Sequence, residues 1–63
     1  MQKSFYYLVS HSDLYHKLTA LSKLEIEYDV ERIDGQLAIV FPDLPVRQYA
    51  EVHALFGCVG QTY

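Results

Sequence analysis

Several residue types that mark particular protein classes are scarce in this sequence. Its 63 residues include one cysteine, Cys58, no tryptophan, three glycines and two prolines. A single cysteine excludes an internal disulfide bond, and no apolar run is long enough to cross a membrane. The N-terminal segment also lacks the apolar stretch and small-residue cleavage site of a signal peptide. We therefore expect a cytoplasmic protein that does not associate with membranes.

Positive charge is scarce as well. Five Lys and Arg residues stand against eight Asp and Glu residues, which gives a formal net charge of −3. Affinity for nucleic acids depends largely on neutralising phosphates with basic side chains. Direct binding to DNA or RNA is thus disfavoured, and the expected partner is a larger protein with a neutral or basic surface.

Motifs that carry out chemistry are missing too. The sequence contains no Gly-rich phosphate loop, nucleophile elbow, Cys-x-x-Cys pair or His-Glu-x-x-His helix. The spacing of His11 and His16 is not that of metal ligands, and His53 is better interpreted as a structural histidine. We predict neither catalysis nor a bound metal or cofactor.

Apolar residues make up 51% of the chain, and six residues are tyrosine. This is enough for one small folded domain over residues 1–63, although a chain of this size buries a limited core. Additional burial against a partner or a second copy would add to its stability.

The most informative stretch, residues 25–41, predicts a β-hairpin. Residues 25–30 alternate polar and apolar, and Asp34-Gly35 favours a two-residue turn because glycine accepts positive φ without a steric clash. Such a turn fixes the cross-strand pairs as Ile33–Gln36, Arg32–Leu37, Glu31–Ala38, Val30–Ile39, Asp29–Val40 and Tyr28–Phe41.

The flanking segments complete the expected elements. Residues 3–9 are rich in aromatic and β-branched residues and predict a strand. Ser10, or alternatively Ser12, caps a helix that buries Leu14, Leu18 and Leu21. A second helix over residues 45–56 ends at Gly57. Its expected core face consists of Val46, Tyr49, Ala50, His53 and Phe56.

The order of elements predicts an α+β fold. We expect a small two-layer β-α-β-β-α sandwich that resembles the ferredoxin-like arrangement, an antiparallel sheet with both helices on one face. The third strand then lies between the second and the first, and residues 58–63 either form a short fourth strand beside the first or fray. In an alternative arrangement, the first strand pairs with a second copy of the chain.

The sheet face opposite the helices is the candidate binding surface. Its apolar centre comprises Tyr6, Leu8, Ala38 and Val40, and its acidic border comprises Glu25, Glu27, Asp29 and Glu31. An apolar centre with a polar rim is typical of protein interfaces. The acids have a simpler interpretation, since charge on an edge strand also prevents aggregation.

We therefore expect a small, non-enzymatic, protein-binding regulator or inhibitor, such as an accessory factor of a phage or another mobile element. One alternative is a homodimeric interaction module. A second is an acidic nucleic-acid mimic that occupies a basic groove of its partner.

Overall fold

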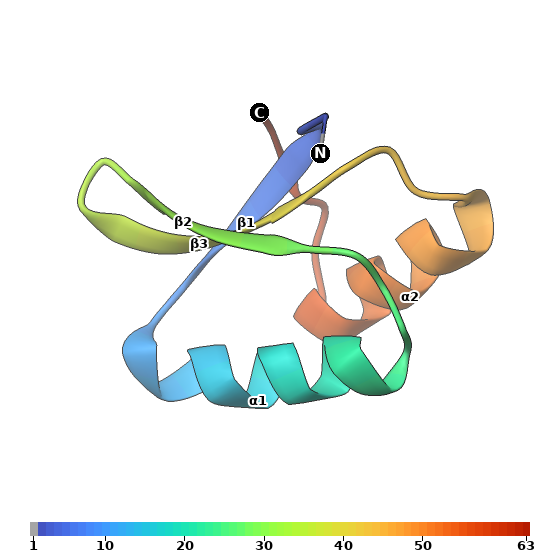
Figure 1. The fold of residues 1–63 in the computed structure, drawn as a ribbon, viewed down its shortest axis with the longest axis horizontal. Coiled ribbons are helices and arrows are strands. Elements are labelled where there is room, and N and C mark those ends of the chain that lie inside the picture. Colours follow the sequence, from blue (N-terminus) through green and yellow to red (C-terminus); the bar gives the residue numbers. More distant parts are fainter. Residues whose placement is uncertain (1) are drawn as a thin grey trace.

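The computed structural model describes residues 2–63 and contains two helices and four strands (Figure 1). In chain order these are β1 (Phe5–Val9), α1 (His11–Lys23), β2 (Asp29–Ile33), β3 (Gln36–Phe41), α2 (Val46–Phe56) and β4 (Gln61–Thr62).

The four strands form one open antiparallel sheet in the order β2-β3-β1-β4. The prediction that the third strand lies between the second and the first is confirmed. The tail forms the short strand β4 beside β1, where Phe5 pairs with Thr62 and Tyr6 with Gln61. Among the described residues, neither helix has the length and apolar content needed to cross a bilayer.

The β2–β3 hairpin has the predicted turn and register. Asp34 and Gly35 both have positive φ, 52° and 80°, as a type I′ turn requires. Five of the six predicted pairs are observed, from Asp29–Val40 to Ile33–Gln36. The sixth, Tyr28–Phe41, is not formed because β2 begins at Asp29. Side chains at alternate positions therefore fall on the two sheet faces as expected.

The start of β2 differs from the prediction. The strand begins at Asp29, because the preceding residues terminate α1 instead. Glu25 has a φ of 57°, its amide donates to the Ser22 carbonyl, and the Ile26 amide donates to the Leu21 carbonyl, both at 3.1 Å. These two bonds define a Schellman motif, and its usual apolar contact is present because Leu21 and Ile26 belong to one buried cluster.

The helix ends agree with the sequence signals at two positions. The Ser10 hydroxyl accepts from the Asp13 amide at 3.3 Å at the start of α1, and Gly57 ends α2 with a φ of 75°. The ammonium of Lys17 on α1 donates to the Leu55 carbonyl at 2.9 Å. This contact gives an open carbonyl at the end of α2 a cationic partner.

The buried face of α2 differs from the predicted face. Val52 is fully buried and Leu55 packs against the core, whereas Val46 is 86% exposed and three further predicted residues are also exposed: Tyr49, Ala50 and His53. This helix is apolar on two sides, so residue spacing did not determine which side faces the core. The prediction was correct for Phe56, which is partly buried, and its ring stacks on that of Tyr7 at 4.0 Å.

The core combines residues of both helices with residues of β1 and β3. Its buried members are Phe5, Tyr7, Leu21, Ile26, Ile39, Phe41 and Val52. The Tyr7 hydroxyl donates to the Cys58 carbonyl at 2.7 Å, and burial raises the pKa of this tyrosine. Gly60 fits closely beside this group, because a Cβ there would lie 2.9 Å from the rings of both Phe5 and Tyr7.

The left-handed backbone at Glu25 leads to a stability prediction. A residue with a Cβ is strained in this conformation, so Glu25→Gly should raise the free energy of unfolding by about 1 kcal/mol. Urea denaturation followed by circular dichroism measures the change. The matched substitution Glu27→Gly should give no such gain, since Glu27 does not have positive φ. A destabilised Glu25→Gly variant would contradict this account of how α1 ends.

Candidate functional site

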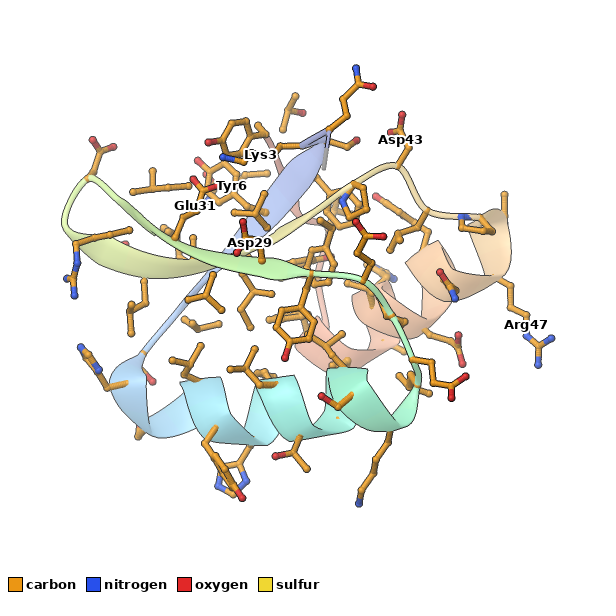
Figure 2. The ribbon with its side chains drawn as sticks, viewed as in Figure 1. Lys3, Tyr6, Asp29, Glu31, Asp43 and Arg47 are labelled. Atoms are coloured by element: carbon orange, nitrogen blue, oxygen red, sulfur yellow. The ribbon has the colours of Figure 1, made fainter. Side chains whose placement is uncertain are left out.

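The predicted binding face is assembled from three strands. Cross-strand pairing gives one row of Tyr6, Val40 and Asp29 and a second row of Leu8, Ala38 and Glu31. Because paired residues project to the same side of a sheet, these side chains share one face. Figure 2 shows Tyr6 and Glu31 on the side of the sheet away from α1.

Two of the four predicted border acids lie outside β2. Glu25 forms the end of α1, and Glu27 lies in the segment before β2 begins. Both are exposed, but they do not continue the column formed by Asp29 and Glu31. The expected ladder of four acids is therefore wrong, because the alternation that predicted it starts in a helix terminus.

The expected exposure of Ala38 and Val40 is also wrong. Both side chains are fully buried. Val40 lies between Tyr6 and Asp29 in its row, and Ala38 lies between Leu8 and Glu31. Small side chains on a central strand are shielded by larger neighbours on the same face, so a partner would meet these neighbours instead.

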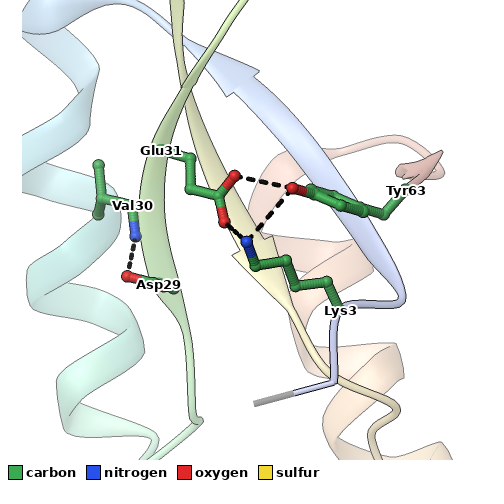
Figure 3. A network of polar contacts seen from close by, with 5 residues as sticks. All are labelled: Lys3, Asp29, Val30, Glu31 and Tyr63. Carbon is green, nitrogen blue, oxygen red and sulfur yellow. Dashed lines mark hydrogen bonds and ion pairs between the residues drawn. The ribbon is translucent and has the colours of Figure 1, made fainter.

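A polar cluster lies on this face and joins both ends of the described chain (Figure 3). Glu31 forms an ion pair with the Lys3 ammonium and accepts a hydrogen bond from the Tyr63 hydroxyl at 2.9 Å. Lys3 also donates to the Tyr63 hydroxyl at 3.3 Å and lies 5.2 Å from the centre of its ring. Both carboxylate oxygens of Glu31 are thus engaged.

Two tyrosines form the aromatic part of the same face. The rings of Tyr6 and Tyr63 meet edge to face, with centroids 6.0 Å apart, and the Tyr6 hydroxyl donates to Gln61 Oε1 at 2.9 Å. A shallow hollow of about 200 Å³ lies beside them, lined by Tyr6, Ile33, Thr62 and Tyr63. We call the surface formed by Lys3, Tyr6, Leu8, Glu31, Ile33 and Tyr63 the tyrosine face.

Sequence reasoning missed Lys3, Ile33 and Tyr63 as members of this face. The signal for Ile33 was the hairpin register, which places it two residues from Glu31 on the same side. A signal for Tyr63 existed in the alternation of the tail, two positions after Gln61, which pairs with Tyr6. Lys3 precedes β1 and had no comparable signal.

The Lys3–Glu31 pair determines the electrostatics of the tyrosine face. Hydrogen bonding to Lys3, and secondarily to Tyr63, lowers the pKa of Glu31, while the hydrogen bond to Glu31 raises the pKa of Lys3. Both groups are ionised at neutral pH and their charges cancel. Water screens this pair from the Lys3 side, where 35% of the side chain is exposed, whereas the Oε2 atom of Glu31 is buried.

Asp29 plays a different part at the sheet edge. Its Oδ1 atom accepts the amide of Val30 at 2.9 Å (Figure 3). β2 is the outer strand on this side, and a carboxylate that occupies a backbone donor there hinders pairing with another strand. Asp29 thus has a structural role that does not require a partner.

A second, larger hollow of about 400 Å³ lies where the end of β1, the start of α1 and the hairpin meet. Leu8 and Leu37 line it together with Arg32 and His11. The guanidinium of Arg32 donates to the Gly35 carbonyl at 3.1 Å, so it already has a partner in the hairpin. In residues 2–63, no three His, Cys, Asp or Glu side chains gather where they could hold a metal ion.

In comparisons with protein-family models, curated proteins and solved structures, nothing matched this chain.

The lowered pKa of Glu31 gives a pH prediction. The Glu31 carboxylate takes up a proton less readily in the folded state than in the unfolded state. Its contribution to the free energy of unfolding is therefore complete above the ordinary pKa of 4.5 and is lost as pH falls through the lower pKa of the folded state. Glu31→Gln should therefore destabilise the protein at neutral pH, and its difference from wild type should shrink below pH 4.5. Urea unfolding over a pH series measures this difference.

Glu27→Gln is the matched control, because Glu27 is exposed and lies off the strand. Its difference from wild type should stay small and vary little with pH. If the two variants have the same pH dependence, the Lys3–Glu31 pair does not contribute as described.

Proposed function

We propose that this protein is a non-enzymatic, protein-binding regulator or inhibitor that holds a larger protein against its tyrosine face. The observation that carries the proposal is the exposure of apolar and aromatic side chains around a neutralised ion pair. Tyr63 is 52% exposed and Leu8 is 40% exposed, and Tyr6 and Ile33 are partly exposed beside them. Aromatic side chains of this kind are enriched where proteins bind one another.

We propose further that the arrangement is ferredoxin-like, with both helices on one face of the sheet. The strand order supports this, and so does the single buried cluster that contains Leu21 of α1, Val52 of α2 and residues of β1 and β3. In the view of Figure 1, α1 lies below the sheet, and α2 runs from the right downwards to the same side. Such an arrangement leaves the tyrosine face free for a partner.

The electrostatics favour a partner with a neutral or basic surface. The chain carries a net charge of −3, and the Lys3–Glu31 pair leaves the centre of the tyrosine face without excess charge. Complementary charge between partners accelerates association and selects among candidates. The free thiol of Cys58 is compatible with the reducing cytoplasm, which we propose as the site of action.

The alternative of an acidic nucleic-acid mimic has less support. It needs a row of negative charges with regular spacing, and only Asp29 and Glu31 share β2. A homodimer that uses the tyrosine face remains compatible with the exposed residues, and the experiment below distinguishes it from binding to another protein.

The test measures binding after the partner has been captured from an extract of the native host and identified by mass spectrometry. Tyr63→Ala should weaken that complex by about 2 kcal/mol, or roughly thirty-fold, because it removes an aromatic side chain at the centre of the interface. Isothermal titration calorimetry with the purified partner measures the loss. Circular dichroism checks that the variant is folded.

Tyr15→Ala is the matched control. Tyr15 is 75% exposed but lies on α1, so its removal should leave affinity unchanged. Leu8→Asp is a second variant on the tyrosine face, and it should also weaken the complex. Unchanged affinity in both face variants, or equal losses in Tyr15→Ala, would contradict the proposal.

Sedimentation of the purified protein tests the homodimer alternative. A monomer at micromolar concentration supports binding to another protein. A dimer that Leu8→Asp dissociates would assign the tyrosine face to a second copy instead.

A further inference from the structure

The tyrosine face already holds a cation. The Lys3 ammonium is ion-paired with Glu31, lies 3.3 Å from the Tyr63 hydroxyl and is 5.2 Å from the centre of the Tyr63 ring. A carboxylate, a phenol oxygen and an aromatic ring around one point are the groups that recognise a positively charged side chain. The chemistry of a cation site is therefore present, and the chain's own lysine occupies it.

The receptor side of this site is fixed by the sheet. Glu31 belongs to β2, where it pairs with Ala38 of β3, and the Tyr63 amide donates to the Ser4 carbonyl at 3.0 Å directly after β4. Gly60 anchors the preceding turn, since only a residue without a Cβ fits against Phe5 and Tyr7. Glu31 and Tyr63 thus face each other without depending on Lys3.

The contacts of the Lys3 side chain are partly open to solvent. Lys3 precedes β1 and belongs to no helix or strand, and 35% of its side chain is exposed. A long lysine side chain loses conformational entropy when it is held in one position, and exposed ion pairs gain little net free energy. A competing cation therefore has to overcome only a small stabilisation.

We propose that Glu31 and Tyr63 bind an arginine side chain of the partner protein, which takes the position that Lys3 occupies in the free chain. This inference rests on the proposed function. Arginine suits the site better than lysine because its planar group donates two parallel hydrogen bonds to a carboxylate and stacks on an aromatic ring. The hollow of about 200 Å³ beside Tyr6 and Tyr63 gives room for its aliphatic stem.

The test uses acetyl-arginine amide as the probe, titrated against the full chain and followed by NMR. Lys3→Met removes the competing ammonium, and Lys23→Met removes the same charge from the far end of α1. The Lys3→Met variant should bind the probe about two- to five-fold more tightly than Lys23→Met, the factor that corresponds to one exposed ion pair. The resonances that shift should include those of Glu31 and Tyr63.

Two further comparisons make the result specific. Acetyl-citrulline amide has the same shape without the charge and should not bind, and Glu31→Gln should abolish the arginine response while Glu27→Gln preserves it. Equal affinities of Lys3→Met and Lys23→Met, or equal responses to arginine and citrulline, would overturn the inference. If Tyr63→Ala still weakened the partner complex after such a result, the proposed function would stand and only the arginine inference would be wrong. Failure of the inference and failure of the proposed function are therefore distinguishable.

Discussion

The two-residue turn at Asp34-Gly35 determines which side chains meet on each face of the sheet. It places Glu31 beside Ala38 and Asp29 beside Val40, and it leaves Ile39 and Phe41 on the opposite side with the core. A shift of one residue would move Glu31 to the side of the sheet that carries Ile39 and Phe41 of the core, where an unpaired carboxylate is costly. The tyrosine face therefore exists only in the register that this turn imposes.

The central strand β3 connects the core with the candidate site. All residues from Ala38 to Phe41 are fully buried, although only Ile39 and Phe41 belong to the core cluster. Ala38 and Val40 form the floor of the tyrosine face, beneath the side chains of the neighbouring strands. Packing on both sides of β3 holds this strand in place, and Glu31 pairs with Ala38 of that strand.

The parts of the fold that depend on local chemistry could be predicted from the sequence. Asp34-Gly35 predicted the turn and the register, Ser10 and Gly57 marked helix ends, and connection rules gave the strand order. The start of β2 could not be predicted, because alternation from Glu25 imitates a strand and a non-glycine residue rarely adopts the left-handed conformation observed there.

The candidate site was harder to predict than the fold, because it depends more on contacts between residues far apart in the sequence. The rows that contain Tyr6, Leu8 and Glu31 followed from pairing rules, but the burial of Ala38 and Val40 depends on neighbours from other strands. Lys3 and Tyr63 form a hydrogen bond although they lie 60 residues apart in the sequence, and no local pattern predicts that contact. The buried face of α2 was predicted wrongly for a related reason. The burial of Val52 depends on packing against other elements, and the residue pattern of the helix does not indicate it.

The central claim is that a protein partner covers the tyrosine face. Cross-saturation NMR on the labelled chain in complex with the unlabelled partner tests it most directly, because magnetisation transfers only to residues at the contact. The account predicts transfer to Tyr6, Leu8, Ile33 and Tyr63 and none to the exposed residues of α1 such as Tyr15. Transfer confined to α1 or to the outer face of α2, where Val46 and Ala50 lie, would contradict it.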